Sequence, residues 1–551
     1  MRHATASGRP ASGAGRLPRA APAVVLAALA LAGCSLAAPP DAGGAGQPGT
    51  AGSVPPVTDP AVTAAPDDAL APFYAQRVQW GPCDDVRPPE GLELTRQECG
   101  TLEVPLDYDE PDGDTIGLAL ARLPASGERA GSLVLNPGGP GGSGVDYALQ
   151  AELVTTDRLR AAYDVVGFDP RGVARSAPVD CVDDGTYDAF VAADPSPDDP
   201  RELDALEALA GELATGCGDD PVAPHVDSVS VARDMDVLRA ALGETELDYL
   251  GKSYGTVIGA LYVELFPDRV GRVVLDGAVD LTPRAPDDFT RALEQAGGFE
   301  VALEAFVADC LQQDDCPLAG TTEEGVGQVR ALLASLDTAP LPAEGDDREV
   351  NQGLGLAGLI SPLYNYDLWP GLRLALGLAY TGDGSVLLRL NDFFRERQPD
   401  GSYRSNAGEA IYAVNCLDRG GDPVRRGSVG PDDLDRLSRE LTEAAPTFGP
   451  QLAYGALPCL DWEHTAVPWP EVDGQGAPPV VVVGTTRDPA TPMVWAERLA
   501  DQLDTGVLVR FDGDGHTAYG RAGSGCVDEL LDAFWLEGEV PADGTTCEAA
   551  Y

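Results

Sequence analysis

The sequence of 551 residues is poor in basic and aromatic side chains. It holds 37 Lys and Arg against 89 Asp and Glu, which gives a formal net charge of −52, and Lys252 is its single lysine. So acidic a chain repels phosphate backbones, which excludes nucleic acid as a partner. Aromatic residues make up 6% and apolar residues 44%, so the chain still has ample material for a buried core.

Histidine is scarce as well, with four in the chain. The cysteines form no Cys-x-x-Cys pair and no Cys/His cluster with zinc spacing. No phosphate-binding G-x-x-x-x-G-K-[ST] frame is present. We therefore expect no metal and no cofactor.

The N-terminus predicts export. Residues 1–20 carry four arginines and no acidic residue, and the apolar run 21–32 is too short to span a membrane. The run ends in Leu-Ala-Gly-Cys, which resembles the lipobox of bacterial lipoproteins. The resemblance implies that 1–33 is a signal peptide and that Cys34 carries a lipid, the only membrane contact. Ordinary secretion, with cleavage at a nearby small-residue site, is the alternative.

The rest of the chain predicts an α/β fold. Residues 34–72 form an Ala/Gly/Pro-rich tether, and apolar β-type runs alternate with helical patterns from about 100 to 280. A helical, acidic stretch follows, and two further strand patterns complete the chain. The expected domains are 73–280, the first part of an α/β core with a mostly parallel sheet covered by helices on both faces; 281–475, a mainly helical cap; and 476–551, the rest of the core.

An even number of cysteines remains once Cys34 is set aside, in a chain bound for an oxidising compartment. Their spacing suggests that sequence neighbours pair, although spacing does not fix connectivity. The hypothetical pairs are Cys83–Cys99, Cys181–Cys217, Cys310–Cys316, Cys416–Cys459 and Cys526–Cys547.

A Gly-x-Ser-x-Gly pentapeptide, 251–255, points to a nucleophile. It joins a β-type run to a buried helical pattern, which is the context of a nucleophile elbow around Ser253. A serine needs a base, and His516 follows a predicted strand in a glycine-broken loop, unlike His225 and His464. Lys252 occupies a variable position of the pentapeptide, and we assign it no catalytic role.

Asp488 is the candidate that orients the histidine. Asp488 follows a strongly apolar predicted strand. The order Ser253, Asp488, His516 along the chain is that of α/β-hydrolases. Asp276 competes for this role, whereas Asp512 and Asp514 share the loop of the histidine. Asp488 could also be a plain turn residue before proline.

The oxyanion hole is expected in the glycine-rich stretch 135–144, which follows another apolar strand. The backbone N–H groups of Gly139 first, and of Gly138, would act with that of Tyr254, the residue after the nucleophile.

With these residues in place, the chain from about 75 to 551 resembles the secreted actinobacterial tripeptidyl aminopeptidases, which are related to prolyl iminopeptidases. The resemblance is carried by NPGGPGGSG, YDVVGFDPRGVARSAP, GKSYGT, VVLDGAVD, TTRDPATP and DGDGHTAYG. Asn136 stands where prolyl iminopeptidases have histidine. The resemblance implies release of short peptides from substrates with a free N-terminus, through an acyl-enzyme on Ser253.

Such an exopeptidase needs a carboxylate that binds the substrate α-ammonium. Glu409 and Asp418 in the expected cap are candidates, although each is also typical of an acidic surface. The main rival function is that of a carboxylesterase or lipase with the same triad. A lipid-anchored solute-binding protein is the rival from another class, and the sequence leaves the oligomeric state open.

Overall fold

The computed structural model describes residues 60–84, 86, 88, 92, 94–281, 288–420, 431–460, 462–465 and 467–551. The predicted signal peptide and Cys34 lie outside these residues. The described residues contain a nine-stranded sheet in the order β1-β2-β4-β3-β5-β6-β9-β10-β11, in which β2 pairs antiparallel with β1 and β4 and all other pairs are parallel. The strands are β1 Glu98–Pro105, β2 Thr115–Leu123, β3 Gly131–Asn136, β4 Tyr163–Phe168, β5 Leu247–Lys252, β6 Val270–Asp276, β9 Val480–Arg487, β10 Gly506–Asp514 and β11 Thr545–Glu548.

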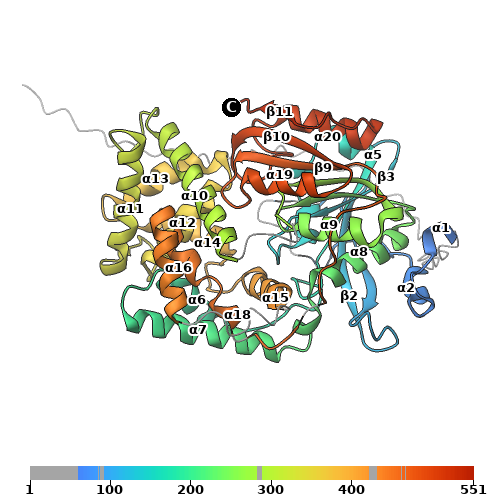
Figure 1. Cartoon of the computed structure of the whole chain (residues 1–551), viewed down its shortest axis with the longest axis horizontal. Helices are drawn as coiled ribbons and strands as arrows, with labels where there is room; N and C mark the ends of the chain where they lie inside the picture. Colours follow the sequence, from blue (N-terminus) through green and yellow to red (C-terminus); the bar gives the residue numbers. More distant parts are fainter. Residues whose placement is uncertain are drawn as a thin grey trace, which may run out of the picture. The chain divides into compact units, whose positions relative to one another are not determined.

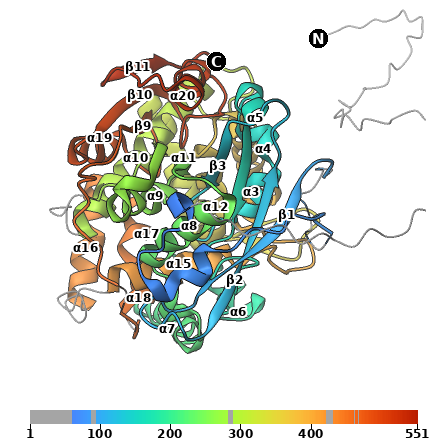
Figure 2. The ribbon, with the colours of Figure 1, turned by 90° about the vertical axis from the view of Figure 1, so that its right-hand side faces the viewer.

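The valine run of β9 shows why the sheet is covered on both faces. Val480 and Val482 belong to the core on one face, and Val481 and Val483 to the core on the other. Consecutive strand side chains point to opposite faces, so an unbroken apolar run fits a strand buried on both sides. Helices of the first face are α8 Ser228–Leu242, α9 Gly255–Leu265 and α19 Met493–Gln502; those of the second are α3 Gly144–Leu149, α4 Ala151–Val154, α5 Asp157–Ala162 and α20 Gly525–Glu537 (Figures 1 and 2).

The predicted fold class is confirmed. The apolar runs singled out in the sequence correspond to β3, β4, β5, β6, β9 and β10. The sequence pattern missed β1, β2 and β11. The first two form an antiparallel pair in which exposed and buried residues alternate, so they give no continuous apolar run.

A helical cap lies between β6 and β9 and has a hydrophobic core of its own (Figure 1). Its elements are α10 Asp288–Cys310, α11 Thr322–Thr338, β7 Leu341–Pro342, β8 Glu349–Val350, α12 Gln352–Leu363, α13 Trp369–Ala379, α14 Ser385–Arg395, α15 Ala407–Gly420, α16 Pro431–Ala444, α17 Gly449–Tyr454 and α18 Leu457–Leu460. All of them fall within the predicted cap 281–475.

Two helices from the first part of the chain also join the cap. They are α6 Asp184–Ala192 and α7 Pro200–Asp219, between β4 and α8. Leu206 and Ala210 of α7 share a core with Leu434 and Leu441 of α16. The prediction that 73–280 belongs wholly to the sheet domain therefore differs from the structure, because an amphipathic pattern does not identify the partner of its apolar side.

The end of the predicted tether 34–72 also differs from the structure. Residues 60–74 contain the short helices α1 Pro60–Thr63 and α2 Ala71–Tyr74. Val62, Leu70 and Tyr74 are buried in the main core, so this segment packs against the sheet domain in spite of its Ala/Pro-rich composition. No helix in the described ranges is long and apolar enough to cross a membrane.

Five disulfides join the cysteines in the pairs that the spacing suggested. Three of them lie in the cap and its adjoining helices, and one of these, Cys310–Cys316, closes a short loop at the end of α10. Cys181–Cys217 ties the segment after β4 to the end of α7, and Cys416–Cys459 ties α15 to α18. A disulfide that closes such a loop lowers the conformational entropy of the unfolded chain, and it thereby stabilises the folded helical layer.

Candidate active site

Ser253 lies at a sharp turn between β5 and α9. Its φ of +54° is in the left-handed region, which non-glycine residues adopt rarely and at a cost in energy. The turn brings strand and helix so close that a Cβ on Gly251 would lie 2.3 Å from the carbonyl oxygen of Gly255. The backbone N–H of Ser253 donates to the carbonyl of Asp276 at 2.9 Å. These features are those of a nucleophile elbow.

His516 and Asp488 meet at the neighbouring strand ends. The Nδ1 atom of His516 lies 2.9 Å from both carboxylate oxygens of Asp488, and both side chains are buried. Asp488 also accepts the backbone N–H groups of Ala490, Thr491 and Thr517. With so many donors the carboxylate is held in one orientation, and it fixes the imidazole with Nδ1 as donor and Nε2 as acceptor.

The imidazole faces the strand beside the elbow. A Cβ on Gly277, directly after β6, would lie 3.3 Å from Cε1 of His516. β5, β6, β9 and β10 are consecutive in the sheet and parallel, so their carboxyl ends meet at one edge. The three candidate triad residues therefore gather at this edge, where open α/β sheets place their sites.

The competing acids have other partners. The buried carboxylate of Asp276 accepts the backbone N–H groups of Ala518 and Tyr519, while Asp512 and Asp514 form ion pairs with Arg487. Among the remaining histidines, His464 contacts the carbonyl of Gly218 at the end of α7. Asp488 is thus the acid that the structure brings to His516.

The glycine-rich loop after β3 lies directly against the elbow. Gly138 and Gly139 have φ of +85° and +113°, and a Cβ on Gly138 would lie 2.7 Å from the backbone nitrogen of Tyr254. Gly138 donates its own N–H to Oδ1 of Asn136 at 2.8 Å. Its N–H is therefore engaged within the loop, which favours Gly139 and Tyr254 as the donors to an oxyanion.

The candidate ammonium-binding acids lie on α15, whose first residues pack against the glycine-rich loop at Gly141. Asp418 accepts hydrogen bonds from the Tyr254 hydroxyl and from the N–H and hydroxyl of Ser228. Burial raises the pKa of Asp418 to about 6, against these hydrogen bonds, which lower it. Glu409 accepts the N–H of Val182, and burial raises its pKa as well. Asp418 thus adjoins the elbow, whereas Glu409 holds the segment after β4.

Two residues that the sequence pattern did not single out touch His516. Thr491 places its hydroxyl 3.1 Å from Asp488 and 3.3 Å from Nδ1 of His516, and its position three residues after Asp488 is a usable signal. The carbonyl of Tyr364, just after α12 of the cap, accepts the backbone N–H of His516, and the ring of Tyr364 lies edge-on to the imidazole. Nothing in the sequence near Tyr364 predicts this contact.

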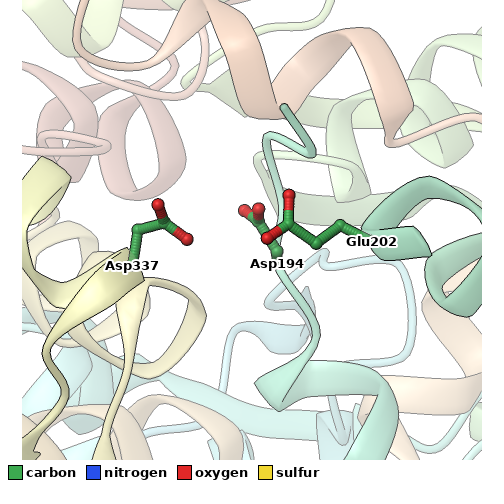
Figure 3. Close-up of side chains that lie close together, drawn as sticks. All are labelled: Asp194, Glu202 and Asp337. Atoms are coloured by element: carbon green, nitrogen blue, oxygen red, sulfur yellow. The ribbon is translucent and has the colours of Figure 1, made fainter. Parts of the chain in front are cut away.

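A group of three carboxylates lies on other elements. The oxygens of Asp194, Glu202 and Asp337 are within 4.8 Å of one another, and Figure 3 shows Asp194 and Glu202 side by side, opposite Asp337. Burial, and then the neighbouring charges, raise the pKa of Asp194. Asp194 and Glu202 also accept backbone N–H groups of their own connection, so local structure accounts for much of the arrangement.

Several known proteins are similar in sequence to this chain over most of its length. A family described as "TAP-like protein" matches residues 445–547, which include Asp488 and His516. Serine protease Hip1 of Mycobacterium tuberculosis is 38% identical over 86% of this chain and 92% of its own. Carboxylesterase B of the same organism is 36% identical over 94% and 96%, and tripeptidyl aminopeptidase of Streptomyces lividans is 33% identical over 82% and 83%.

Proposed function

Because the chain belongs to the family of serine hydrolases that includes Serine protease Hip1 and the tripeptidyl aminopeptidases, we propose that it is an exported aminopeptidase that releases short peptides, tripeptides above all, from free N-termini. The strongest support is the juxtaposition of a strained Ser253 with the His516–Asp488 pair at one edge of the sheet.

The proposed reaction is acyl transfer. His516 takes the proton of the Ser253 hydroxyl at Nε2, Ser253 attacks the scissile carbonyl, and Gly139 and Tyr254 donate to the oxyanion. His516 then protonates the leaving amine, and water hydrolyses the acyl-enzyme by the reverse proton transfers. Asp488 holds the imidazole and stabilises its cation throughout. No cofactor is required.

The free N-terminus would be bound by Asp418, with Glu409 the second candidate. The hydrogen bond from the Tyr254 hydroxyl to Asp418 supports this role, because Tyr254 directly follows the nucleophile. An Asp418→Asn variant should raise KM for a tripeptidyl anilide and leave KM for an N-acetylated ester unchanged, because only the first substrate carries an ammonium. Equal changes in the two KM values would remove Asp418 from this role.

The second candidate function is that of a carboxylesterase, and the similarity to a relative named Carboxylesterase B favours it. Both functions use Ser253, so the decisive measurement compares substrates. The purified protein should hydrolyse a free tripeptidyl anilide faster than its N-acetylated form and faster than a simple ester. Turnover that is indifferent to N-acetylation would exclude the aminopeptidase.

Reaction with a fluorophosphonate probe tests the nucleophile itself. The wild-type protein should be labelled and a Ser253→Ala variant should not. Equal labelling of both proteins, or none of the wild type, contradicts the serine mechanism and leaves the solute-binding alternative.

We further propose that the protein works outside the cytoplasm, tethered by a lipid on Cys34. The five disulfides support an oxidising compartment. A Cys34→Ala variant should move from the membrane fraction to the medium or remain uncleaved. An unchanged membrane fraction of mature protein would contradict the lipid anchor.

A further inference from the structure

The single lysine of the chain immediately precedes the candidate nucleophile, and its side chain is buried. Lys252 is the last residue of β5, precedes Ser253, and is 3% exposed. Its Nζ donates to the carbonyl of Tyr519 at 2.5 Å and lies 3.8 Å from Oδ2 of Asp276. Burying an ammonium is expensive unless it is paired, so a position with two defined partners indicates a specific use of the charge.

Asp276 holds the same turn through two of its backbone N–H groups. Its carboxylate accepts the N–H of Ala518 at 2.9 and 3.1 Å and that of Tyr519 at 2.9 Å. Lys252 therefore takes the carbonyl of Tyr519 while Asp276 takes the N–H. The two side chains come from the ends of adjacent strands, β5 and β6.

The turn that they hold is the one that carries His516. Gly515 has φ of +93° and Thr517 has φ of +66°, so the backbone on both sides of the imidazole is in the left-handed region. For Thr517 this conformation is costly and persists only where the surroundings impose it. Contacts at Ala518 and Tyr519 supply that constraint within two or three residues of His516.

We infer that Lys252 is a positioning residue, which sets the His516 loop relative to Ser253. The inference rests on the proposed function, in which these two residues react together. Ser253 is bonded to Lys252, so a contact from Nζ to the turn links the nucleophile to its base by a short path through the protein. The ammonium lies in the protein interior with Tyr519 and Asp276, so its removal should disturb proton transfer and leave substrate binding alone.

A Lys252→Met variant tests this role, because methionine keeps most of the apolar stem and removes the ammonium. We expect kcat to fall about 10- to 100-fold, because a shift of the reacting groups by up to about 1 Å lowers the rate by that factor. KM should change by less than about threefold. The rate of inactivation by a fluorophosphonate should fall in the same proportion. A kcat within about twofold of wild type, in folded protein, overturns the inference.

Arg239→Met is the matched control. Arg239 is another buried cation beside a buried carboxylate, 2.8 Å from Asp236, but it lies on α8. Its removal should lower the melting temperature and leave kcat unchanged. If it lowers kcat as much as Lys252→Met does, the effect reports general destabilisation and the inference fails.

Failure of the inference is distinguishable from failure of the proposed function. A wild-type protein that does not react with the fluorophosphonate contradicts the function, whereas a reactive wild type with an equally reactive Lys252→Met contradicts the positioning role alone. If Lys252→Met does not fold, the wild type still provides a test. Lysine labelled with ¹⁵N gives one Nζ signal, which should shift when Ser253 is phosphonylated; an unshifted signal overturns the inference.

Discussion

The sheet and the cap contribute to the candidate active site in different ways. Ser253, Asp488 and His516 each follow a parallel strand, so the topology of the sheet brings them to one edge. Tyr364 and Asp418 come from the cap and reach the site through individual contacts with His516 and Tyr254. The reacting groups are thus set by backbone topology, whereas their surroundings depend on how helices pack. Changes on the sheet side should mainly affect kcat, and changes in the cap should mainly affect binding and stability.

The largest effect is expected on the sheet side. Ser253→Ala should lower kcat by about 10⁴- to 10⁶-fold, because no other group supplies the nucleophile. Steady-state assays of purified protein, with fluorophosphonate labelling as the second readout, measure this loss. Thermal stability should stay the same or rise. Alanine adopts the same strained φ of +54° as serine, so the strain is unchanged, and the substitution removes a polar group from the site. Residual activity within tenfold of wild type would place the chemistry elsewhere.

The next effect concerns the glycine-rich loop. Gly138→Ala should lower kcat by about 10²- to 10³-fold, because the new Cβ meets the backbone of Lys252 and Tyr254 at 2.3 and 2.7 Å and displaces the loop from the elbow. Gly382→Ala in the cap is the control. Gly382 has a similar φ of +93°, and a Cβ added there would meet no described atom within 4 Å, so the change should cost about 1 kcal/mol of stability and no activity. Equal losses in kcat for Gly138→Ala and Gly382→Ala would contradict the assignment of the oxyanion hole to the glycine-rich loop.

Removal of the Cys416–Cys459 disulfide tests the cap. A Cys416→Ser/Cys459→Ser variant should lose about 3–4 kcal/mol of unfolding free energy, since the bridge closes a loop with a sequence separation of 43. It should also raise KM, because α15 carries Asp418. The Cys526→Ser/Cys547→Ser variant, at the edge of the sheet, should lose comparable stability without a change in KM. Urea unfolding measures the stability of both variants, and steady-state kinetics measure their KM values. A rise in KM for the Cys526→Ser/Cys547→Ser variant alone would contradict the expectation that the cap, and not the sheet, governs substrate binding.

The smallest expected effect is the pH dependence that arises from Asp418. Its pKa is raised from 3.8 to about 6 in the folded protein, so the folded state binds this proton more tightly than the unfolded state. The contribution of Asp418 to stability is therefore present in full below pH 4 and is lost as the pH rises through 6. Asp418→Asn should remove this loss, so that the variant gains roughly 2 kcal/mol on wild type between pH 4 and pH 7. A difference in unfolding free energy that is flat with pH would contradict the assignment.

Much of the sheet was open to prediction from the sequence. Apolar runs with β-branched residues identify six of its strands, and the pentapeptide around Ser253 requires a sharp strand-to-helix turn because a side chain at Gly251 would collide with Gly255. Asp488 and His516 were predicted from their places after strands, and the structure brings them within 2.9 Å. These features depend on short segments, whose geometry local sequence dictates.

The sequence alone therefore determined the fold class, the elbow and the order of the candidate triad, since each follows from periodicity and from backbone sterics. The tertiary structure decided what surrounds them. That Tyr364 buttresses His516, that α6 and α7 join the cap, and that Lys252 and Asp276 hold one turn are consequences of contacts between residues far apart in the chain. Lysine in a variable position of the pentapeptide gives no hint of its partner, because a buried charge is matched by whatever polar group the fold brings to it.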